Sequence, residues 1–295
     1  MAIYGGKKMQ IRQLSFLLMG VVVGFAGTQS ATANEESCHW NYGAGCGSPD
    51  NWSHLSGHDG ASYAACSAGK QQSPIDLDEG QAVGDAKPLT LRFNWTDWRS
   101  GGQIFNNGHT IQVKVQDENS LTIGDEAFTL LQFHFHSQSE HVVKGAHYPM
   151  EVHFVHKSKK DGSLAVVGVM LDQSDAEDAS NPYLQIMQKA PHGSSHGSEQ
   201  SAEVSLPPIS PKGMLPLAAP LKSGNHEYPD YYSYEGSLTT PPCSEKVRWI
   251  VLKDPIRIPA AAIEEFHHAF PVNPGNARPV QPLNLRTVHR SWNAN

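Results

Sequence analysis

Short runs in which hydrophobic and polar positions alternate dominate the chain from Leu89 onward, and this period of two predicts β-strands. Gly, Asn, Asp and Lys separate the runs, and only Asn181–Lys189 and Ala260–Phe270 favour helices. We therefore predict a mainly β (α+β) single domain, with one large, twisted, mostly antiparallel central sheet of about ten strands and short peripheral helices. The predicted strands are Leu89–Phe93, Ile111–Val115, Ser120–Ile123, Thr129–His136, Met150–His156, Leu164–Leu171 and Val247–Leu252.

The first 33 residues have the features of an export signal. Three basic residues, Lys7, Lys8 and Arg12, precede an apolar stretch from Leu14 to Ala26, and a small-residue cleavage site ends at Ala33. An uncleaved N-terminal anchor is the alternative, but an apolar run of this length is too short to span a bilayer comfortably. We predict a signal peptide over residues 1–33, a mature domain over residues 34–295, and a periplasmic or secreted location.

The charge of the chain excludes two classes of partner. The formal net charge is −7, and it becomes −10 when the export signal with its three basic residues is removed. A chain this acidic binds nucleic acid and anionic membranes poorly. We expect no nucleic acid and, after signal cleavage, no membrane among its partners.

Four cysteines in the exported part predict two disulfides. They are Cys38, Cys46, Cys66 and Cys243, and none stands at the C-x-x-C spacing of a metal site. An even number in an oxidising compartment allows three connectivities. We favour a local Cys38–Cys46 bond and a long-range Cys66–Cys243 bond, which would contribute on the order of 5 kcal/mol in the loop-entropy description.

Three histidines in two neighbouring predicted strands form a candidate zinc site. Side chains of an extended strand alternate between its faces, so Gln132, His134 and His136 share one face. On the other face, packed into a core, we expect Leu131, Phe133 and Phe135. The same rule puts Glu151 and His153 on one face of the next strand. If the strands pair antiparallel, three neutral imidazoles converge and leave a coordination position open, which is typical of catalytic zinc, with Gln132 and Glu151 behind them.

A His-x-His pair is also compatible with two alternatives to a zinc site. An exposed strand can carry histidines on its solvated face. His134 and His136, followed by Glu140, also fit the first metal motif of cupins, where the glutamate would bind iron or manganese. Cupins require a second motif that ends in a histidine, but His153 follows too closely and no later stretch supplies it.

Several short motifs around the histidines resemble those of the α-class carbonic anhydrases and follow one another in the family's order. The short spacing of three residues between His136 and Glu140 resembles the bacterial exported type. The resemblance extends from His39-Trp40-Asn41-Tyr42 to Asn276-Ala277-Arg278-Pro279-Val280-Gln281-Pro282-Leu283. The motifs between are Gln72-Ser73-Pro74-Ile75, Asn106-Asn107-Gly108-His109, Ser139-Glu140-His141 and Ser237-Leu238-Thr239-Thr240-Pro241-Pro242. It implies a zinc lyase that reversibly hydrates carbon dioxide to bicarbonate and a proton, and that sulfonamides and anions inhibit.

The resemblance also implies the roles of single residues. His134, His136 and His153 would bind Zn2+, which lowers the pKa of its water to about 7 and so provides the attacking hydroxide, carbonic anhydrase being the standard example. Thr239 would accept a hydrogen bond from this hydroxide and donate its own to Glu140, which is then an orienting group and not a ligand. His109 would be the proton shuttle, because an imidazole accepts and releases protons near neutrality.

Further positions support these groups by the same resemblance. Gln132 would accept a hydrogen bond from His134, Glu151 from His153, and the Asn276 carbonyl from His136. His141 and Tyr234 would form a buried pair under the site, and Tyr42 and Asn107 would order water. The substrate pocket would be formed by Val155, Val166, Leu238, Thr240, Val247 and Trp249.

Two segments depart from the family pattern. Only Ser137-Gln138-Ser139 separates His136 from Glu140, and a proline is more usual at Gln138. The segment His192–Ser205 is polar and rich in Gly and Ser, so we predict a mobile surface loop there despite its two histidines. Neither change touches a ligand. A non-catalytic relative would have lost a ligand or Thr239, and none is missing; a homodimer is one assembly that the sequence allows.

Overall fold

The computed structural model describes residues 38–192, 202–211, 213–216, 229–271 and 275–292. Ser37–Asn295 form one compact unit. The predicted signal peptide and most of the segment 192–205 lie outside the described residues.

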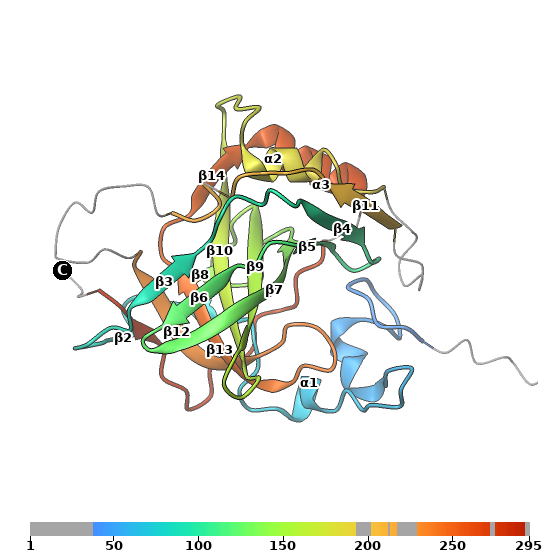
Figure 1. Ribbon diagram of the computed structural model, residues 1–295. Coiled ribbons are helices and arrows are strands. Elements are labelled where there is room, and N and C mark those ends of the chain that lie inside the picture. The colour runs from blue at the N-terminus through green and yellow to red at the C-terminus, as the bar shows by residue number, and fades with distance from the viewer. Residues whose placement is uncertain (1–37, 193–201, 212, 217–228, 272–274, 293–295) are drawn as a thin grey trace, which may run out of the picture. The chain divides into compact units, whose positions relative to one another are not determined.

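A mixed sheet of thirteen strands dominates the described part of the chain (Figure 1). Its main path runs in the order β11-β4-β5-β7-β9-β10-β13-β12-β15-β2, with β14 beside β10 and the β3–β6 pair beside β7. A separate parallel pair consists of β1 (Asp76–Leu77) and β8 (Val142–Val143). The strands of the large sheet are β2 (Val83–Gly84), β3 (Leu91–Asn94), β4 (Gly102–Asn106), β5 (Ile111–Val115), β6 (Ser120–Ile123), β7 (Glu126–His136), β9 (Met150–Ser158), β10 (Leu164–Ser174), β11 (Ala202–Leu206), β12 (Tyr231–Ser237), β13 (Glu245–Leu252), β14 (Ile256–Pro259) and β15 (His289–Arg290).

The predicted fold class is confirmed, with two corrections of detail. The sheet is mostly antiparallel, as predicted, although β10 pairs in parallel with both β13 and β14, and β15 pairs in parallel with β2. The sheet has more strands than the roughly ten predicted, since the sequence pattern did not predict β2, β4, β11, β12, β14 and β15. Residues 202–205 of the predicted loop belong to β11, where Val204 pairs with Ile104 of β4.

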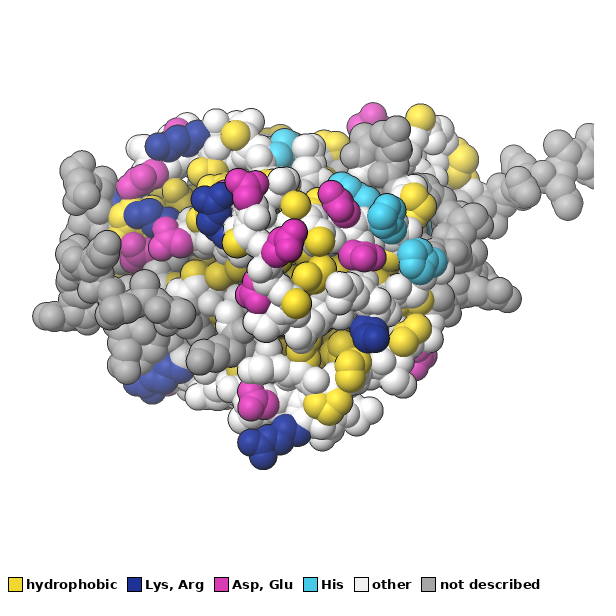
Figure 2. Space-filling view, turned by 90° about the horizontal axis from the view of Figure 1, so that it is seen from above, with side chains coloured by type: hydrophobic (Ala, Val, Ile, Leu, Met, Phe, Trp, Pro, Cys, Tyr) yellow, Lys and Arg dark blue, Asp and Glu magenta, His cyan; other side chains and the backbone are white. Residues whose placement is uncertain are grey.

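The helices are short, as predicted. They are the 3-10 helix η1 (Pro49–His54) and the α-helices α1 (Ala65–Ala68), α2 (Pro182–Met187) and α3 (Ala260–Ala269). The Asn181 side chain caps α2 by accepting from the Tyr183 and Leu184 backbone N–H groups. α2 and α3 lie side by side along one side of the sheet (Figure 1). The surface on that side carries histidine side chains close to acidic ones (Figure 2).

A hydrophobic cluster lies on each face of the paired strands β7 and β9. On one face Phe133, Phe135 and Phe154 are fully buried in the larger hydrophobic cluster. On the other face Val155 and Trp249 belong to a second cluster. The expected burial of Leu131 is wrong, because the β7–β9 register shifts between Leu130 and Gln132 and leaves the Leu131 side chain 44% exposed.

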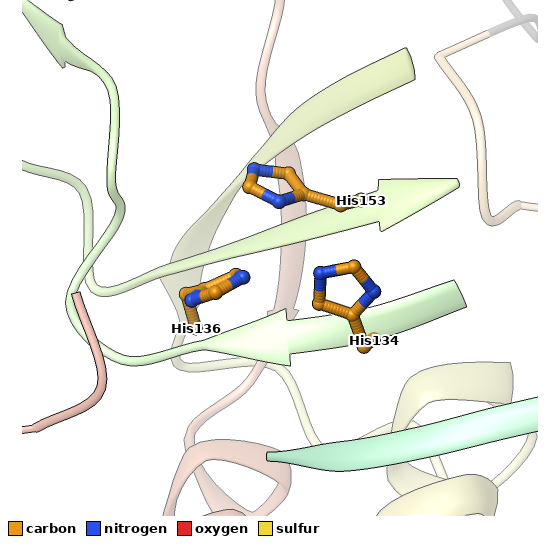
Figure 3. A group of neighbouring side chains, drawn as sticks. All are labelled: His134, His136 and His153. Carbon is orange, nitrogen blue, oxygen red and sulfur yellow. The ribbon is translucent and has the colours of Figure 1, made fainter. Parts of the chain in front are cut away.

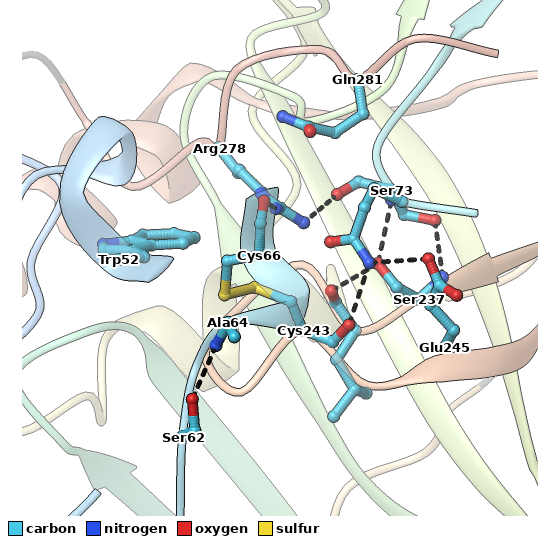
Figure 4. Close-up of a disulfide and its surroundings, with 12 residues drawn as sticks. Trp52, Ser62, Ala64, Cys66, Ser73, Ser237, Cys243, Glu245, Arg278 and Gln281 are labelled. Atoms are coloured by element: carbon cyan, nitrogen blue, oxygen red, sulfur yellow. Dashed lines mark hydrogen bonds between the residues drawn. A yellow bond between two sulfur atoms is a disulfide. The ribbon is translucent and has the colours of Figure 1, made fainter. Parts of the chain in front are cut away.

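Both favoured disulfides are present. Cys38–Cys46 joins residues 8 positions apart, and Cys66–Cys243 joins residues 177 positions apart. The second bond ties α1 to the chain that follows Thr239 and Thr240, at the end of β12 (Figure 4).

Candidate metal centre

The three predicted ligands lie together on the central strands. β7 and β9 pair antiparallel with His134 opposite His153, and His136 lies one pleat further along the same face. The three rings point toward one space (Figure 3), and one ring nitrogen of each lies within 4.8 Å of those of the others.

In each ring, the second nitrogen is held by an oxygen that can only accept. His134 Nδ1 lies 2.9 Å from Oε1 of Gln132, and His136 Nδ1 lies 2.8 Å from the carbonyl oxygen of Asn276. These rings therefore donate from Nδ1 and keep the lone pair on Nε2. Burial lowers the pKa of His134 and of His136, so both rings are neutral at pH 7.

His153 has the opposite orientation, because its Nε2 lies 2.9 Å from Oε1 of Glu151 and its Nδ1 is left for a cation. The same carboxylate oxygen lies 2.8 Å from Nδ1 of His141, and Oε2 accepts from the backbone N–H groups of Glu140 and His141. Burial favours a neutral carboxyl, but the charges and hydrogen bonds of the two histidines outweigh it and hold the pKa of Glu151 well below its usual value. Glu151 is thus ionised, and its carboxylate holds the rings of His153 and His141 in place behind the site.

The donor set fits zinc. Three imidazoles that each offer a lone pair are a common ligand set of catalytic zinc, and the Nε2 atom of His136 is buried without a hydrogen-bond partner among the described residues. His141, Glu151 and His153 also lie close together. That second group is already satisfied by its own hydrogen bonds, because the other nitrogen of His141 lies 2.7 Å from the Tyr234 hydroxyl.

Glu140 lies beside the three histidines. Its Oε2 atom is 3.4 Å from His136 Nε2 and 3.8 Å from His153 Nδ1, and it has no hydrogen-bond partner among the described residues. The expected hydrogen bond from Thr239 is therefore not formed, although Thr239 is buried in the turn after β12. These distances alone fit both an orienting carboxylate and the cupin-type ligand.

Residues 47–292 match the eukaryotic-type carbonic anhydrase family. The chain belongs to the α-class carbonic anhydrases. It is 40% identical to the carbonic anhydrase of Pectobacterium carotovorum over 265 residues, which cover 88% of this chain and 93% of the relative. Membership in this family implies an enzyme that reversibly hydrates carbon dioxide, and α carbonic anhydrases are zinc enzymes.

Solved structures agree with this assignment. The complex of the α-carbonic anhydrase of Thermovibrio ammonificans with sulfanilamide superposes with a TM-score of 0.67 at 38% identity, covering 85% of this chain and 98% of that one. The carbonic anhydrase of Chlamydomonas reinhardtii in complex with acetazolamide gives a TM-score of 0.69 at 34% identity, covering 86% and 100%.

The carbonic anhydrase fold also places the expected pocket residues together. Val155, Val166, Val247 and Trp249 belong to one buried cluster, and Leu238 packs against it. Thr240 is partly buried in the turn that contains Thr239.

Asn107 and Tyr42 are the two residues expected to order water. The Asn107 side chain accepts from the backbone N–H of His109. Tyr42 is buried, and its hydroxyl has no partner among the described residues. Burial first, and then the charge of Glu140, raises the pKa of Tyr42 well above its usual value, so this hydroxyl keeps its proton.

Sequence reasoning assigned no role to Arg278. Its backbone N–H donates to Oε1 of Glu140, and its guanidinium donates to the carbonyl oxygens of Ser73 and Cys66 at 2.7 and 2.9 Å (Figure 4). Burial lowers its pKa to about 10, which leaves the charge in place at neutral pH. An arginine in a motif shared with the family was the available signal, but its partners lie more than 130 positions earlier in the chain.

Proposed function

We propose that the chain binds one zinc ion through Nε2 of His134, Nε2 of His136 and Nδ1 of His153, and that it uses this ion to hydrate carbon dioxide reversibly. The observation that carries the proposal is the arrangement of the three rings. Each has one nitrogen held by an acceptor, and the other nitrogen faces the same space. Such a site is ordered before a cation arrives.

When bound, zinc supplies Lewis acidity that lowers the pKa of a water molecule to about 7, as carbonic anhydrase itself illustrates. The residues of the chain orient this chemistry. Oε2 of Glu140 is buried without a partner among the described residues and can only accept, so it would accept a hydrogen bond from the hydroxyl of Thr239. Thr239 could then only accept from the nucleophile, which would aim the oxygen lone pair at the substrate carbon.

Carbon dioxide is apolar and needs an apolar wall, which Val155, Val166, Val247 and Trp249 supply, with Leu238 beside them. Bicarbonate, the product, would leave toward solvent. His109 would accept the proton that the reaction releases, through waters ordered by Asn107 and Tyr42. We expect sulfonamides and anions to inhibit, as the relatives in complex with sulfanilamide and acetazolamide suggest.

We further propose that the chain works in the periplasm or outside the cell. Two disulfides are typical of an oxidising compartment. Among the described residues, the helices are all too short or too polar to cross a bilayer.

The test is metal analysis combined with a stopped-flow assay of carbon dioxide hydration. We expect about one zinc per chain, activity that a chelator removes and zinc restores, and inhibition by acetazolamide. The variant His153→Ala should lose both metal and activity, whereas His54→Ala, at an exposed histidine of η1, should keep both. Iron or manganese in place of zinc, with no hydration activity, would support the cupin-type alternative and end the proposal.

A further inference from the structure

A cavity of about 470 Å3 lies where β3 and β6 meet β12 and β13 (Figure 1). Leu91 and Ile123, a cross-strand pair of β3 and β6, line it together with Ile250 of β13. All three belong to the larger hydrophobic cluster and not to the one that contains the residues of the expected substrate pocket. Sites for small molecules have volumes of about 300 to 1,000 Å3, so this cavity can hold a ligand away from the metal centre.

Exposed apolar side chains border the cavity. Leu89 is 48% exposed, Leu285 is fully exposed, and both line the cavity. They are two of the six large hydrophobic side chains that are exposed in the part of the chain that the structure describes. A ligand with an apolar body would remove them from water, which favours its binding.

Arg286 provides a positive charge at the same cavity. Its guanidinium donates to three backbone carbonyl oxygens at 2.9 to 3.1 Å, which leaves two of its five N–H groups for a ligand. Burial withdraws this charge from water and lowers the pKa of Arg286, which stays protonated at neutral pH. Arg248, the second arginine at the cavity, is already paired with Glu126 and Glu235.

We infer that this cavity binds a small amphipathic anion, namely a carboxylate with an aliphatic or aromatic body. The carboxylate group would pair with Arg286, and the apolar body would lie against the side chains of β3, β6 and β13. A carboxylate can accept two N–H bonds from one guanidinium, whereas a cationic ligand would be repelled. Ser233 and Thr287 add hydroxyl groups to the lining. None of the three zinc ligands lines this cavity.

Decanoate is the probe, and isothermal titration calorimetry of the chain measures its affinity. Decyltrimethylammonium has the same apolar chain and the opposite charge, and both are used below the concentrations at which they form micelles. We expect decanoate to bind about tenfold more tightly than the cation. The formal net charge of the chain is −7, so non-specific attraction would favour the cation instead.

Acetazolamide and three variants locate the bound anion. Acetazolamide should not displace decanoate, because it occupies the metal centre. Arg286→Gln should weaken decanoate binding about tenfold. Arg257→Gln is the matched control, since Arg257 also donates to a carbonyl oxygen but is exposed and lies outside the cavity, and it should bind decanoate as wild type does. Ser233→Phe puts a ring into the cavity and should abolish binding in a chain that circular dichroism shows to be folded.

The inference is wrong if decanoate binds no better than decyltrimethylammonium, or if Arg286→Gln binds decanoate as wild type does. Displacement of decanoate by acetazolamide would place the anion at the metal centre, which refutes the separate site and supports the proposed function. A chain that lacks zinc-dependent hydration but binds decanoate through Arg286 would refute the proposed function and support the anion site.

Discussion

The Nδ1 atom of His136 lies 2.8 Å from the backbone carbonyl oxygen of Asn276, a residue 140 positions later in the chain. The same asparagine is fixed to the residue after His136 in both directions. Its side-chain oxygen accepts from the Ser137 N–H at 2.8 Å, and its own N–H donates to the Ser137 carbonyl at 3.1 Å. The C-terminal segment therefore sets the direction of one metal ligand.

Gly275 is the residue that allows this close approach. Its φ is +127°, and a Cβ atom there would lie 2.1 Å from the carbonyl oxygen of Ser137. We expect Gly275→Ala to destabilise the fold by about 3 kcal/mol, because both backbone strain and a backbone clash result. Zinc affinity should fall as well, since Asn276 would move away from His136.

Gly60 provides the matched control for Gly275. Its φ is +77°, but nothing lies within 4 Å of a Cβ there, so Gly60→Ala adds strain without a clash. We expect it to destabilise by about 1 kcal/mol and to keep zinc. Urea unfolding and competition with a chelator measure both effects. Equal losses in the two variants would show that the approach to Ser137 is unimportant.

Glu151 should matter more for metal affinity than Gln132. Glu151 accepts four hydrogen bonds, two of them from the rings of His153 and His141, whereas the only bond of the Gln132 side chain within the described part of the chain is the one to His134. In Glu151→Gln the amide NH2 would face N–H donors, and the negative charge behind His153 would be lost. Zinc affinity should therefore fall about 10- to 100-fold.

Chelator competition at pH 7 measures these affinities. Gln132→Ala is the control, because it removes one acceptor from a partly buried position and leaves the charge in place. A larger loss in Gln132→Ala than in Glu151→Gln would contradict the view that the buried carboxylate anchors the site.

The alternation of side chains between the two faces of a strand was enough to predict that the three histidines of this site lie together. It put His134 and His136 on one face of β7 and His153 on the facing strand, and β7 and β9 do pair antiparallel. It failed at Leu131, because a shift in register depends on the partner strand and leaves no signal in the alternation itself.

Other features depend on contacts that no local pattern reveals. β4 (Gly102–Asn106) and β12 (Tyr231–Ser237) contain Gly, Ser or polar residues that disfavour strands, and their neighbours in the sheet impose the extended conformation. The hydrogen bond of Arg278 to Glu140 and the contact between the rings of His109 and His39 join segments far apart in the chain. The role of Asn276 was available only through the resemblance to a family.

The Cys66–Cys243 bond should contribute more stability than Cys38–Cys46. In the loop-entropy description, closures of 177 and 8 residues contribute about 5 and about 2.5 kcal/mol. The long bond also holds the chain just after Thr239, and the Cys66 carbonyl accepts from Arg278. We expect the Cys66→Ser/Cys243→Ser variant to melt well below wild type and to lose activity.

The Cys38→Ser/Cys46→Ser variant is the control for the long disulfide, and it should show a smaller fall in melting temperature. Calorimetry with and without a strong reductant measures the combined contribution of both bonds in the unmodified chain. An unchanged melting temperature under reductant would show that neither bond stabilises the folded state.

His156 should make the protein less stable in acid, independently of the metal site. It lies on β9 with its Nδ1 bonded to the Phe154 carbonyl, and its Nε2 is buried without a partner among the described residues. Burial lowers its pKa to about 4, against about 6.5 for an exposed imidazole. The unfolded chain therefore binds a proton at His156 between these values and the folded chain does not, so the free energy of unfolding falls as pH drops from about 6.5 to about 4, by about 3 kcal/mol in all.

The variant His156→Gln isolates this contribution, because an amide can keep the bond to the Phe154 carbonyl and does not titrate in this range. Urea unfolding at a series of pH values should give a wild-type curve that falls more steeply with acid than the curve of His156→Gln, while the other titrating groups cancel in the difference. The exposed His54→Gln should follow wild type. Parallel curves for wild type and His156→Gln would mean that His156 is protonated equally easily in the folded and unfolded chains, and that its burial has no effect on acid stability.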